Sequence, residues 1–520
     1  MAATLWQVHR GAVHVAPTAI TDMSASGLVR AIAGGELTAL EAVDAHIARI
    51  EEVNPRLNAI VVPLFEDARN RARDADRTPA GARGPLHGVP VTVKECFDVA
   101  GTPSTAGLTA RSGHRAEHDA PLVARLRQAG AIIVGKTNDS QLLLYVESDN
   151  PVYGRTNHPL DAERSPGGSS GGEAAIIAAA GSPLGVGTDI GGSVRVPAHS
   201  CGIHALKPTP GRLSVAGTVE MIGPAARAAI PDSGGILGRH VVDLQLAFEV
   251  LSASASDALS LREIRVGFYE GDGYIAASAA IRRAVREAAS ALKDRGCQVV
   301  AFPPPDIEEA IAVYYGLFGA DGGATWRAQL HGGAVDPRVQ DLLTLAGMPN
   351  TARPFVAALL RVQGQPTLAR TMTYGRGRSS QTDVAALVRR RDAYRARFAA
   401  AMASAGVNVL ICPPSAVPAV RHGTTRQLGP ASVSYTCLYN LLAYPAGVVS
   451  TSSVREDETS SRPRSREKVL DTARAIDVGS AGLPVGVQVV AGPGREDRVL
   501  AVMAALEAST ARDLRRSRAP

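Results

Sequence analysis

Apolar residues recur at helical spacing in the N-terminal part of the chain. The pattern predicts helices over Met23–Ala33 and Ala39–Val53, with Thr38 as the N-cap candidate of the second. A third helix is predicted over Phe65–Asp76, and the turn-rich segment Thr78–Gly84 follows it as a boundary. Helices therefore precede the first strand pattern in this sequence.

From Gly88 onward, short apolar runs alternate with amphipathic segments. Gly88–Lys94 is typical of a buried strand, and Pro121–Ala129 of a helix. Such alternation predicts an α/β protein with a largely parallel or mixed β-sheet covered by α-helices. Further strands are predicted over Ala131–Val134, Pro183–Asp189, Glu263–Gly271 and Val407–Pro413, and further helices over Ala174–Ala180 and Ala277–Lys293.

Two later segments depart from this alternation. Within residues 337–364, one short predicted helix carries a cluster of apolar residues flanked by Arg353 and Arg361. This composition is typical of an interfacial helix, but an ordinary core-facing helix has the same pattern. Residues 451–468 are polar and charged, so we expect a solvated loop or a disordered insertion there. The apolar cluster consists of Phe355, Val356, Leu359, Leu360 and Val362.

Composition excludes several classes of protein. Of the 520 residues, 45% are apolar and 20% are charged, which is ordinary for a globular protein. The net charge of +6 is spread without an aromatic-interleaved basic stripe, which argues against nucleic acid as a partner. No apolar run approaches the roughly 18 residues of a transmembrane helix, and residues 1–20 make a poor signal peptide.

The cysteines indicate a reducing environment. They lie far apart, their number is odd, and no CxxC pair occurs. Neither a disulfide framework nor a zinc site is predicted, and the absence of HExxH leaves us expecting no metal and no organic cofactor. The cytoplasm is the compartment we expect. The cysteines are at positions 96, 201, 297, 412 and 437.

The glycine- and serine-rich stretch Arg164–Leu213 carries the candidate chemistry. Ser169 and Ser170 stand in one glycine-flanked site and Ser193 in another. Glycine on both sides lets the backbone turn tightly and leaves N–H groups free to point at an oxyanion. Nucleotide binding is not indicated, because residues 185–191 lack GxGxxG spacing and no GxxxxGK[ST] occurs.

This stretch resembles the amidase signature family, serine hydrolases of amide bonds that use a Ser–Ser–Lys triad. Ser193 in DIGGS matches the family nucleophile, and Ser169 in GGSSGG matches the bridging serine, which a cis peptide holds in the family. Lys94 in GVPVTVKECFDVAG matches the lysine. The resemblance extends over residues 25–505 in separate segments.

The resemblance also implies roles for neighbours of these residues. Ser170 matches a family position that hydrogen-bonds within the site, although it could equally cap the helix that follows. Asp189 and Arg195 bracket the nucleophile, and we expect them to support it through an ion pair or a cap. The family's oxyanion hole corresponds to the N–H groups of Ile190, Gly191, Gly192 and Ser193.

Lysine is rare in this chain, which singles out Lys94. Of the 55 basic residues only those at positions 94, 136, 207, 293 and 468 are lysine. Arginine cannot deliver a neutral base, so we interpret Lys94 as retained for proton transfer, with a strand-end salt bridge as the alternative. Burial among hydroxyls would depress its pKa, and Glu95 should point to the opposite face. His199 and His204 fit the role of base less well.

Sequence segments outside the triad motifs resemble the fatty acid amide hydrolase branch of the family. It includes GKTNDSQLLLYVESDNPVYGRTNHP at residues 135–159, where Leu142 and Leu143 are candidates for an acyl pocket or for a buried helical turn. Enzymes of that branch carry an apolar cap through which lipid enters. Residues 337–380 lie at the equivalent place, which makes Phe355 and Leu359 further substrate-binding candidates.

These resemblances imply a fold, a domain plan and a function. The family fold has a central mixed, twisted β-sheet covered on both sides by α-helices. We expect a helical arm over residues 1–77 packed on a single catalytic core over residues 78–515. The expected activity is acyl-enzyme cleavage of carboxylic amides, with fatty acid amides or other hydrophobic N-acyl amines as substrates. An amidotransferase subunit that releases ammonia from glutamine, or an amidase for short-chain or aryl amides, is the alternative. Homodimerisation and peripheral contact with the inner membrane surface stay open.

Overall fold

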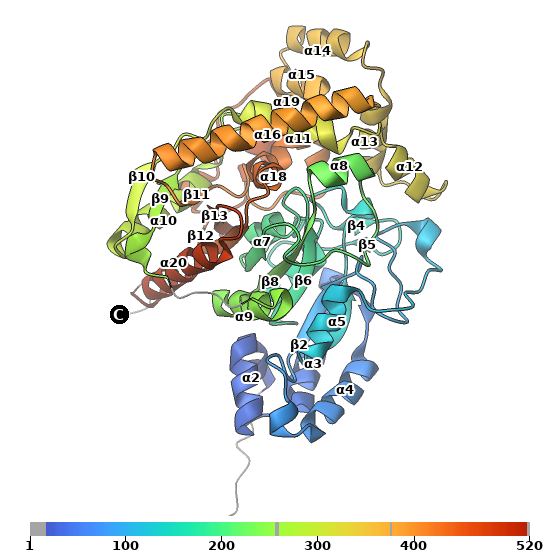
Figure 1. Ribbon diagram of the computed structural model, residues 1–520, viewed down its shortest axis with the longest axis vertical. Coiled ribbons are helices and arrows are strands. Elements are labelled where there is room, and N and C mark those ends of the chain that lie inside the picture. Colours follow the sequence, from blue (N-terminus) through green and yellow to red (C-terminus); the bar gives the residue numbers. More distant parts are fainter. Residues whose placement is uncertain (1–16, 255–258, 375–376, 517–520) are drawn as a thin grey trace, which may run out of the picture.

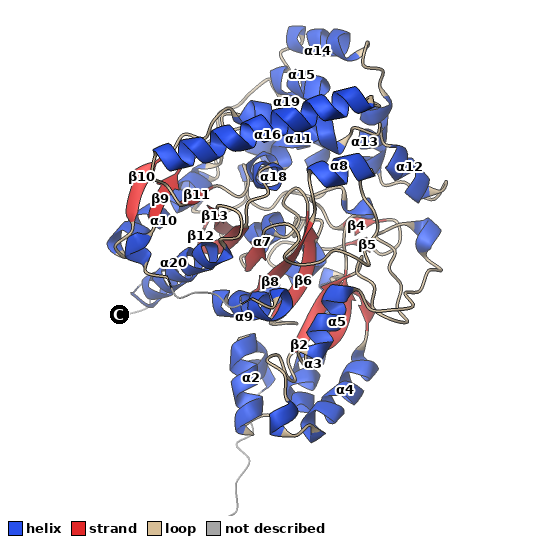
Figure 2. Ribbon diagram, in the orientation of Figure 1, coloured by secondary structure: helices blue, strands red, loops and turns tan. Residues whose placement is uncertain are grey.

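The computed structural model describes residues 17–254, 259–374 and 377–516 (Figure 1). The expectation about a signal peptide in residues 1–20 falls almost entirely outside these ranges. One large mixed sheet runs through the molecule, and helices cover both of its faces (Figure 2). The predicted fold class is confirmed.

The central sheet has 11 strands in the order β1-β3-β2-β6-β8-β7-β12-β13-β11-β9-β10. The pairs β2–β3, β2–β6, β9–β10 and β9–β11 are parallel, and the other neighbours are antiparallel. A separate ribbon pairs β4 (Asp149–Asn150) with β5 (Gly154–Arg155). The sheet strands are β1 (Ile60–Pro63), β2 (Pro90–Lys94), β3 (Ile132–Thr137), β6 (Leu184–Asp189), β7 (His204–Lys207), β8 (Ser233–Gly238), β9 (Arg265–Phe268), β10 (Gln298–Ala301), β11 (Val409–Cys412), β12 (Ala446–Ser453) and β13 (Pro484–Ala491).

Along the sheet, α3 packs against α6 and α6 against α7. In a second row, α5 packs against α9, α9 against α20 and α20 against α10. The N-terminal helices are α1 (Pro17–Asp22), α2 (Ala25–Gly34), α3 (Ala39–Leu57), α4 (Phe65–Arg77), α5 (Pro121–Gln128), α6 (Gly171–Ala178), α7 (Arg195–Cys201), α8 (Pro224–Ala229), α9 (Val241–Ser252) and α10 (Ala279–Asp294). The later helices are α11 (Ile307–Phe318), α12 (Ala324–Leu330), α13 (Pro337–Gly347), α14 (Arg353–Val362), α15 (Pro366–Tyr374), α16 (Gln381–Ser404), α17 (Thr425–Leu428), α18 (Ser434–Leu441), α19 (Lys468–Asp477) and α20 (Glu496–Arg516).

The predicted N-terminal helices are present, and one begins as the sequence indicates. Thr38 caps α3 through a reciprocal pair of bonds with Glu41. The sequence pattern did not reveal β1, whose four residues follow α3 and pair with β3 at the edge of the sheet. Residues 1–77 therefore contribute a strand to the sheet as well as helices.

The strand ends explain where the chemistry gathers. β2 and β6 are parallel neighbours, and every residue of both is buried. Lys94 ends β2 and Asp189 ends β6, so the lysine and the turn toward Ser193 leave the sheet at the same edge. Ligands of open α/β sheets bind at such carboxyl edges.

The helices between β10 and β11 form a separate layer above this edge. In Figure 1, α11, α13, α15 and α16 lie over the sheet and α14 is the outermost element at the top of the view. Residues 337–380 thus comprise α13, α14 and α15. The apolar cluster of the sequence lies on α14, as predicted, but Arg353 is buried and does not flank it at the surface.

The expectation of a solvated loop over residues 451–468 is confirmed between β12 and α19, where most of the side chains are exposed. β12 extends to Ser453, and α19 begins at Lys468. The segment between them is fastened by charge: Arg283 pairs with Glu458 at 2.7 Å, and Arg462 pairs with Asp477 at 2.7 Å. These ion pairs fasten the loop to α10 and α19, so the alternative of a disordered insertion is wrong.

Candidate active site

Lys94 lies buried among hydroxyl groups. Its Nζ donates to Ser169 Oγ at 2.6 Å and to Thr188 Oγ1 at 3.0 Å, and neither partner is a carboxylate. Burial lowers the pKa of Lys94, while nearby buried acids oppose that shift. Glu95 points elsewhere and accepts from the amides of Thr105 and Ala106. Lys94 is therefore held in the surroundings that favour a neutral amine.

The loop that carries Ser169 is tied to the turn that carries Ser193. The Gly168–Ser169 peptide bond is cis, and the Ser170 amide donates to the Ser193 carbonyl at 3.1 Å. Ser148 Oγ donates to the Ser169 carbonyl at 3.1 Å. Ser170 precedes α6 but its hydroxyl makes no capping bond, and within the described residues its buried Oγ has no partner. The N-capping alternative for Ser170 is wrong.

Asp189 organises the turn that leads to Ser193. Its carboxylate accepts from the amides of Gly192 at 2.9 Å and Val194 at 3.1 Å, and it forms a buried ion pair with Arg195 at 2.8 Å. Burial raises the pKa of Asp189, but the Arg195 charge and these hydrogen bonds outweigh it and hold the pKa below its ordinary value. Asp189 thus stays ionised as a fixed scaffold for the turn.

One expected oxyanion donor is already occupied. The Gly192 N–H is engaged by Asp189 Oδ1, so it is not free to bind an oxyanion. In the described part of the chain, the amides of Ile190, Gly191 and Ser193 donate to no protein acceptor. These three remain as candidates for the oxyanion hole.

Arg195 connects this turn to segments that the sequence analysis did not associate with the site. Its guanidinium donates to Gln488 Oε1 at 2.8 Å and to Asn440 Oδ1 at 2.6 Å, and Asn440 also donates to Asp189 Oδ1 at 2.9 Å. Gln488 lies on β13 and Asn440 on α18. Only the folded chain brings these polar side chains together.

Ser193 opens onto an apolar cavity of about 270 Å³. Leu143 lines it, whereas Leu142 is buried outside the lining. Phe355 and Leu359 are not part of the wall either, and their side chains are 78% and 57% exposed on the surface. The apolar lining residues are Leu143, Leu144, Val146, Ile190, Phe318, Leu342, Leu345, Leu368, Met372, Pro430 and Val433.

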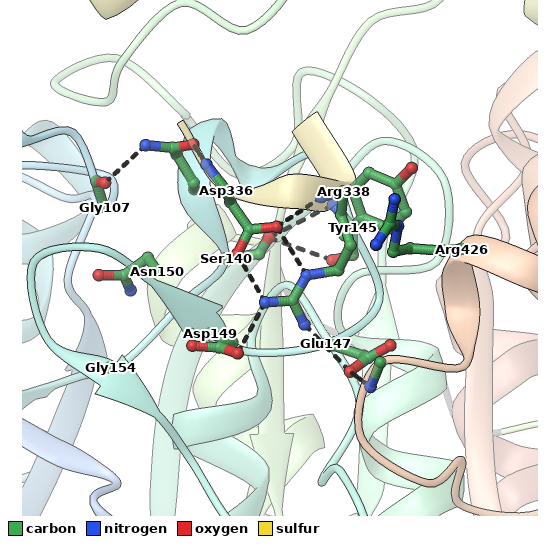
Figure 3. Close-up of polar contacts among 12 residues, drawn as sticks. Gly107, Ser140, Tyr145, Glu147, Asp149, Asn150, Gly154, Asp336, Arg338 and Arg426 are labelled. Carbon is green, nitrogen blue, oxygen red and sulfur yellow. Dashed lines mark hydrogen bonds and ion pairs between the residues drawn. The ribbon is translucent and has the colours of Figure 1, made fainter. Parts of the chain in front are cut away.

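A buried arginine anchors the wall that α13 provides. Arg338, at the start of α13, pairs with Glu147 at 3.0 Å, Asp149 at 2.7 Å and Asp336 at 2.6 Å (Figure 3). Glu147 also accepts from the Gly423 amide at 2.7 Å. The cluster therefore ties α13 to the loop after Tyr145 and to the segment before α17.

Two buried carboxyl groups near Lys94 escaped the sequence analysis. Glu173 on α6 accepts from the hydroxyls of Thr92 at 2.6 Å and Thr137 at 2.9 Å, and burial raises its pKa to about 8. Asp139 is buried with neither carboxyl oxygen hydrogen-bonded within the described residues, and burial raises its pKa as well. No local signal marks either residue, because their burial depends on strand pairing.

The remaining candidates lie away from the cavity. His199 contacts the Val417 carbonyl at 3.1 Å and the Gly486 amide at 3.0 Å, and burial lowers its pKa to about 4. His204 pairs with Glu507 at 3.3 Å. Among the described residues, no cluster of His, Cys, Asp and Glu side chains could hold a metal ion, and no helix could span a membrane.

Lys94 thus contacts the loop of Ser169, that loop is tied to the turn of Ser193, and Ser193 opens onto the apolar cavity. The Amidase family model matches residues 41–500, and the chain belongs to this amidase signature family. It is 33% identical over 504 residues to fatty-acid amide hydrolase 1 of Sus scrofa, covering 92% of this chain and 84% of that protein. Fatty acid amide hydrolase 1 of Caenorhabditis elegans is 31% identical, covering 91% and 86%.

A solved structure of a fatty acid amide hydrolase has the same fold. The TM-score is 0.81 at 24% identity, and the match covers 95% of this chain and 86% of that one. The family and these relatives make the chain an amide hydrolase of the amidase signature type.

Proposed function

We propose that Ser193 is the nucleophile, Ser169 the bridging proton carrier and Lys94 the base. The observation that carries this proposal is the 2.6 Å hydrogen bond from Lys94 Nζ to Ser169 Oγ inside a site without a carboxylate partner for the lysine. A serine hydroxyl is a weak nucleophile until a base takes its proton, and a lysine can do so only when neutral. The lowered pKa of Lys94 supports that state.

The reaction proceeds in two halves. Ser193 Oγ attacks the amide carbonyl while its proton passes through Ser169 to Lys94. The amides of Gly191, Ile190 and Ser193 stabilise the oxyanion, and the C–N bond breaks as the proton returns to the leaving nitrogen. Water then hydrolyses the Ser193 ester and releases the carboxylic acid, with the same groups moving the proton.

The cavity supports a hydrophobic acyl group as the substrate. Its wall is mainly aliphatic and aromatic, and burying each CH₂ of a chain there contributes about 0.8 kcal/mol. The exposed apolar side chains of α14 support peripheral contact with a membrane, because a core-facing helix would bury them. All five cysteines are free and buried, in keeping with the cytoplasm as the compartment.

A series of primary amides and ethanolamides, from acetyl to oleoyl, tests the substrate class. We expect kcat/KM to rise with acyl length until the cavity is filled. Glutamine and aryl acetamides measured in parallel serve as the comparison. Preferred turnover of glutamine would favour an amidotransferase subunit, and preferred turnover of acetyl or aryl amides would favour a short-chain or aryl amidase.

A further inference from the structure

Two hydroxyl groups from outside the glycine-rich stretch hold the carbonyls of the turn before Ser193. Tyr314 on α11 donates to the Ile190 carbonyl at 3.0 Å, and Thr436 on α18 donates to the Gly191 carbonyl at 2.6 Å. Both side chains are buried. Burial also raises the pKa of Tyr314 well above its ordinary value, so its hydroxyl remains a donor across the working pH range.

The direction of a carbonyl fixes the direction of the next amide. In a trans peptide the C=O and N–H groups point in opposite directions, and the Ile190–Gly191 peptide is trans. With the Ile190 carbonyl bound to Tyr314, the Gly191 N–H must point away from that phenol. The Gly191 amide is one of the three in this turn that have no protein acceptor among the described residues.

Tyr314 also sits tightly against the turn. A Cβ atom added at Gly191 would lie 2.8 Å from the Tyr314 hydroxyl oxygen. A side chain at position 191 would therefore collide with the Tyr314 hydroxyl. The backbone angle of Gly191 is not in the left-handed region, so close packing rather than conformation explains the glycine there.

We propose that Tyr314 is a positioning residue that aims the Gly191 N–H at the developing oxyanion. The inference rests on the proposed function, in which this amide belongs to the oxyanion hole. Tyr315 and Phe318 of the same helix line the cavity. The helix that contacts the acyl group therefore also holds the amide that stabilises the transition state, which links substrate recognition to turnover.

The variant Y314F tests the proposal because it removes only the hydroxyl. Losing an oxyanion donor typically costs about 10² in rate, and misdirecting one should cost part of that, so we expect kcat to fall about 10-fold with KM nearly unchanged. Affinity for a trifluoromethyl ketone, which forms an oxyanion on Ser193, should fall by the same factor. Y394F is the matched control, since the buried Tyr394 hydroxyl also donates to a backbone carbonyl, that of Pro305 at 2.8 Å, but Tyr394 does not line the cavity.

A double-mutant cycle with G191A sharpens the test. The added methyl of G191A meets the Tyr314 hydroxyl, so G191A should lower kcat strongly in the wild-type background and much less in Y314F. Additive effects, or a Y314F loss that raises KM and leaves the ketone affinity unchanged, would overturn the inference. If the wild-type enzyme does not react at Ser193 at all, the proposed function fails and this inference fails with it.

Discussion

At the residue scale, Lys94 should act through basicity and not through charge. Its lowered pKa and its two hydroxyl partners favour a neutral amine, whereas arginine keeps its proton. We expect K94A to lose nearly all activity and K94R to restore none of it. The wild-type kcat/KM should rise with pH through the apparent pKa of the lysine and then level off. An active K94R variant would show that position 94 supplies only positive charge.

Glu173 should make the stability of the protein depend on pH. Burial raises its pKa from 4.5 to about 8, so the folded state keeps a proton that the unfolded chain releases between those values. Stability from this group is therefore full below about pH 4.5 and is lost as the pH rises toward 8. Urea unfolding at several pH values should show this loss for the wild type and a clearly flatter profile for E173Q. The exposed Glu163 offers a control in E163Q, and equal slopes in all three proteins would contradict the assignment.

At the scale of elements, α14 should matter for long substrates only. Phe355 and Leu359 are exposed and absent from the cavity wall, so they can act on how a lipid reaches the enzyme but not on how the bound chain is held. The double variant F355S/L359S should raise KM for long-chain amides presented with vesicles, leave acetyl and aryl amides unchanged, and keep Tm. L160S is the control, because Leu160 is also exposed but lies outside the cap.

Two results would contradict this role of α14. A large fall in Tm for F355S/L359S would mean that the apolar face packs against protein. Equal losses on all chain lengths would mean that α14 shapes the active site itself.

At the scale of the whole molecule, the sequence predicted the residues that stand in short motifs. It did not predict contacts between segments that are far apart along the chain. Ser193, Ser169 and Lys94 stand in dense motifs, so their neighbourhoods could be recognised one by one. Tyr314 and Thr436 reach the same turn from helices more than a hundred residues away, and nothing in their own segments marks them. The Gly192 amide illustrates the limit most clearly, since only the folded geometry shows that Asp189 occupies it.

Whole elements also depend on partners that are distant in the sequence. β1 is too short to show an alternating pattern, and it exists because β3 offers a partner at the sheet edge. The charged loop after β12 was predicted, but its order was not, because it depends on Arg283 of α10, which pairs with Glu458, and on Asp477 of α19, which pairs with Arg462. Whether such a segment forms a strand or an ordered loop therefore depends on its partners in the fold more than on its own composition.

Covalent labelling with a fluorophosphonate, followed by intact-mass measurement and peptide mapping, tests most directly whether Ser193 is the nucleophile. If Ser193 is the nucleophile, each chain takes a single adduct on Ser193, and S193A loses both labelling and amide turnover completely while keeping its Tm. Slower labelling of K94A would follow from the loss of the base. Labelling at another serine, or an S193A variant that keeps turnover within about tenfold of the wild type, would contradict the assignment of Ser193 as the nucleophile.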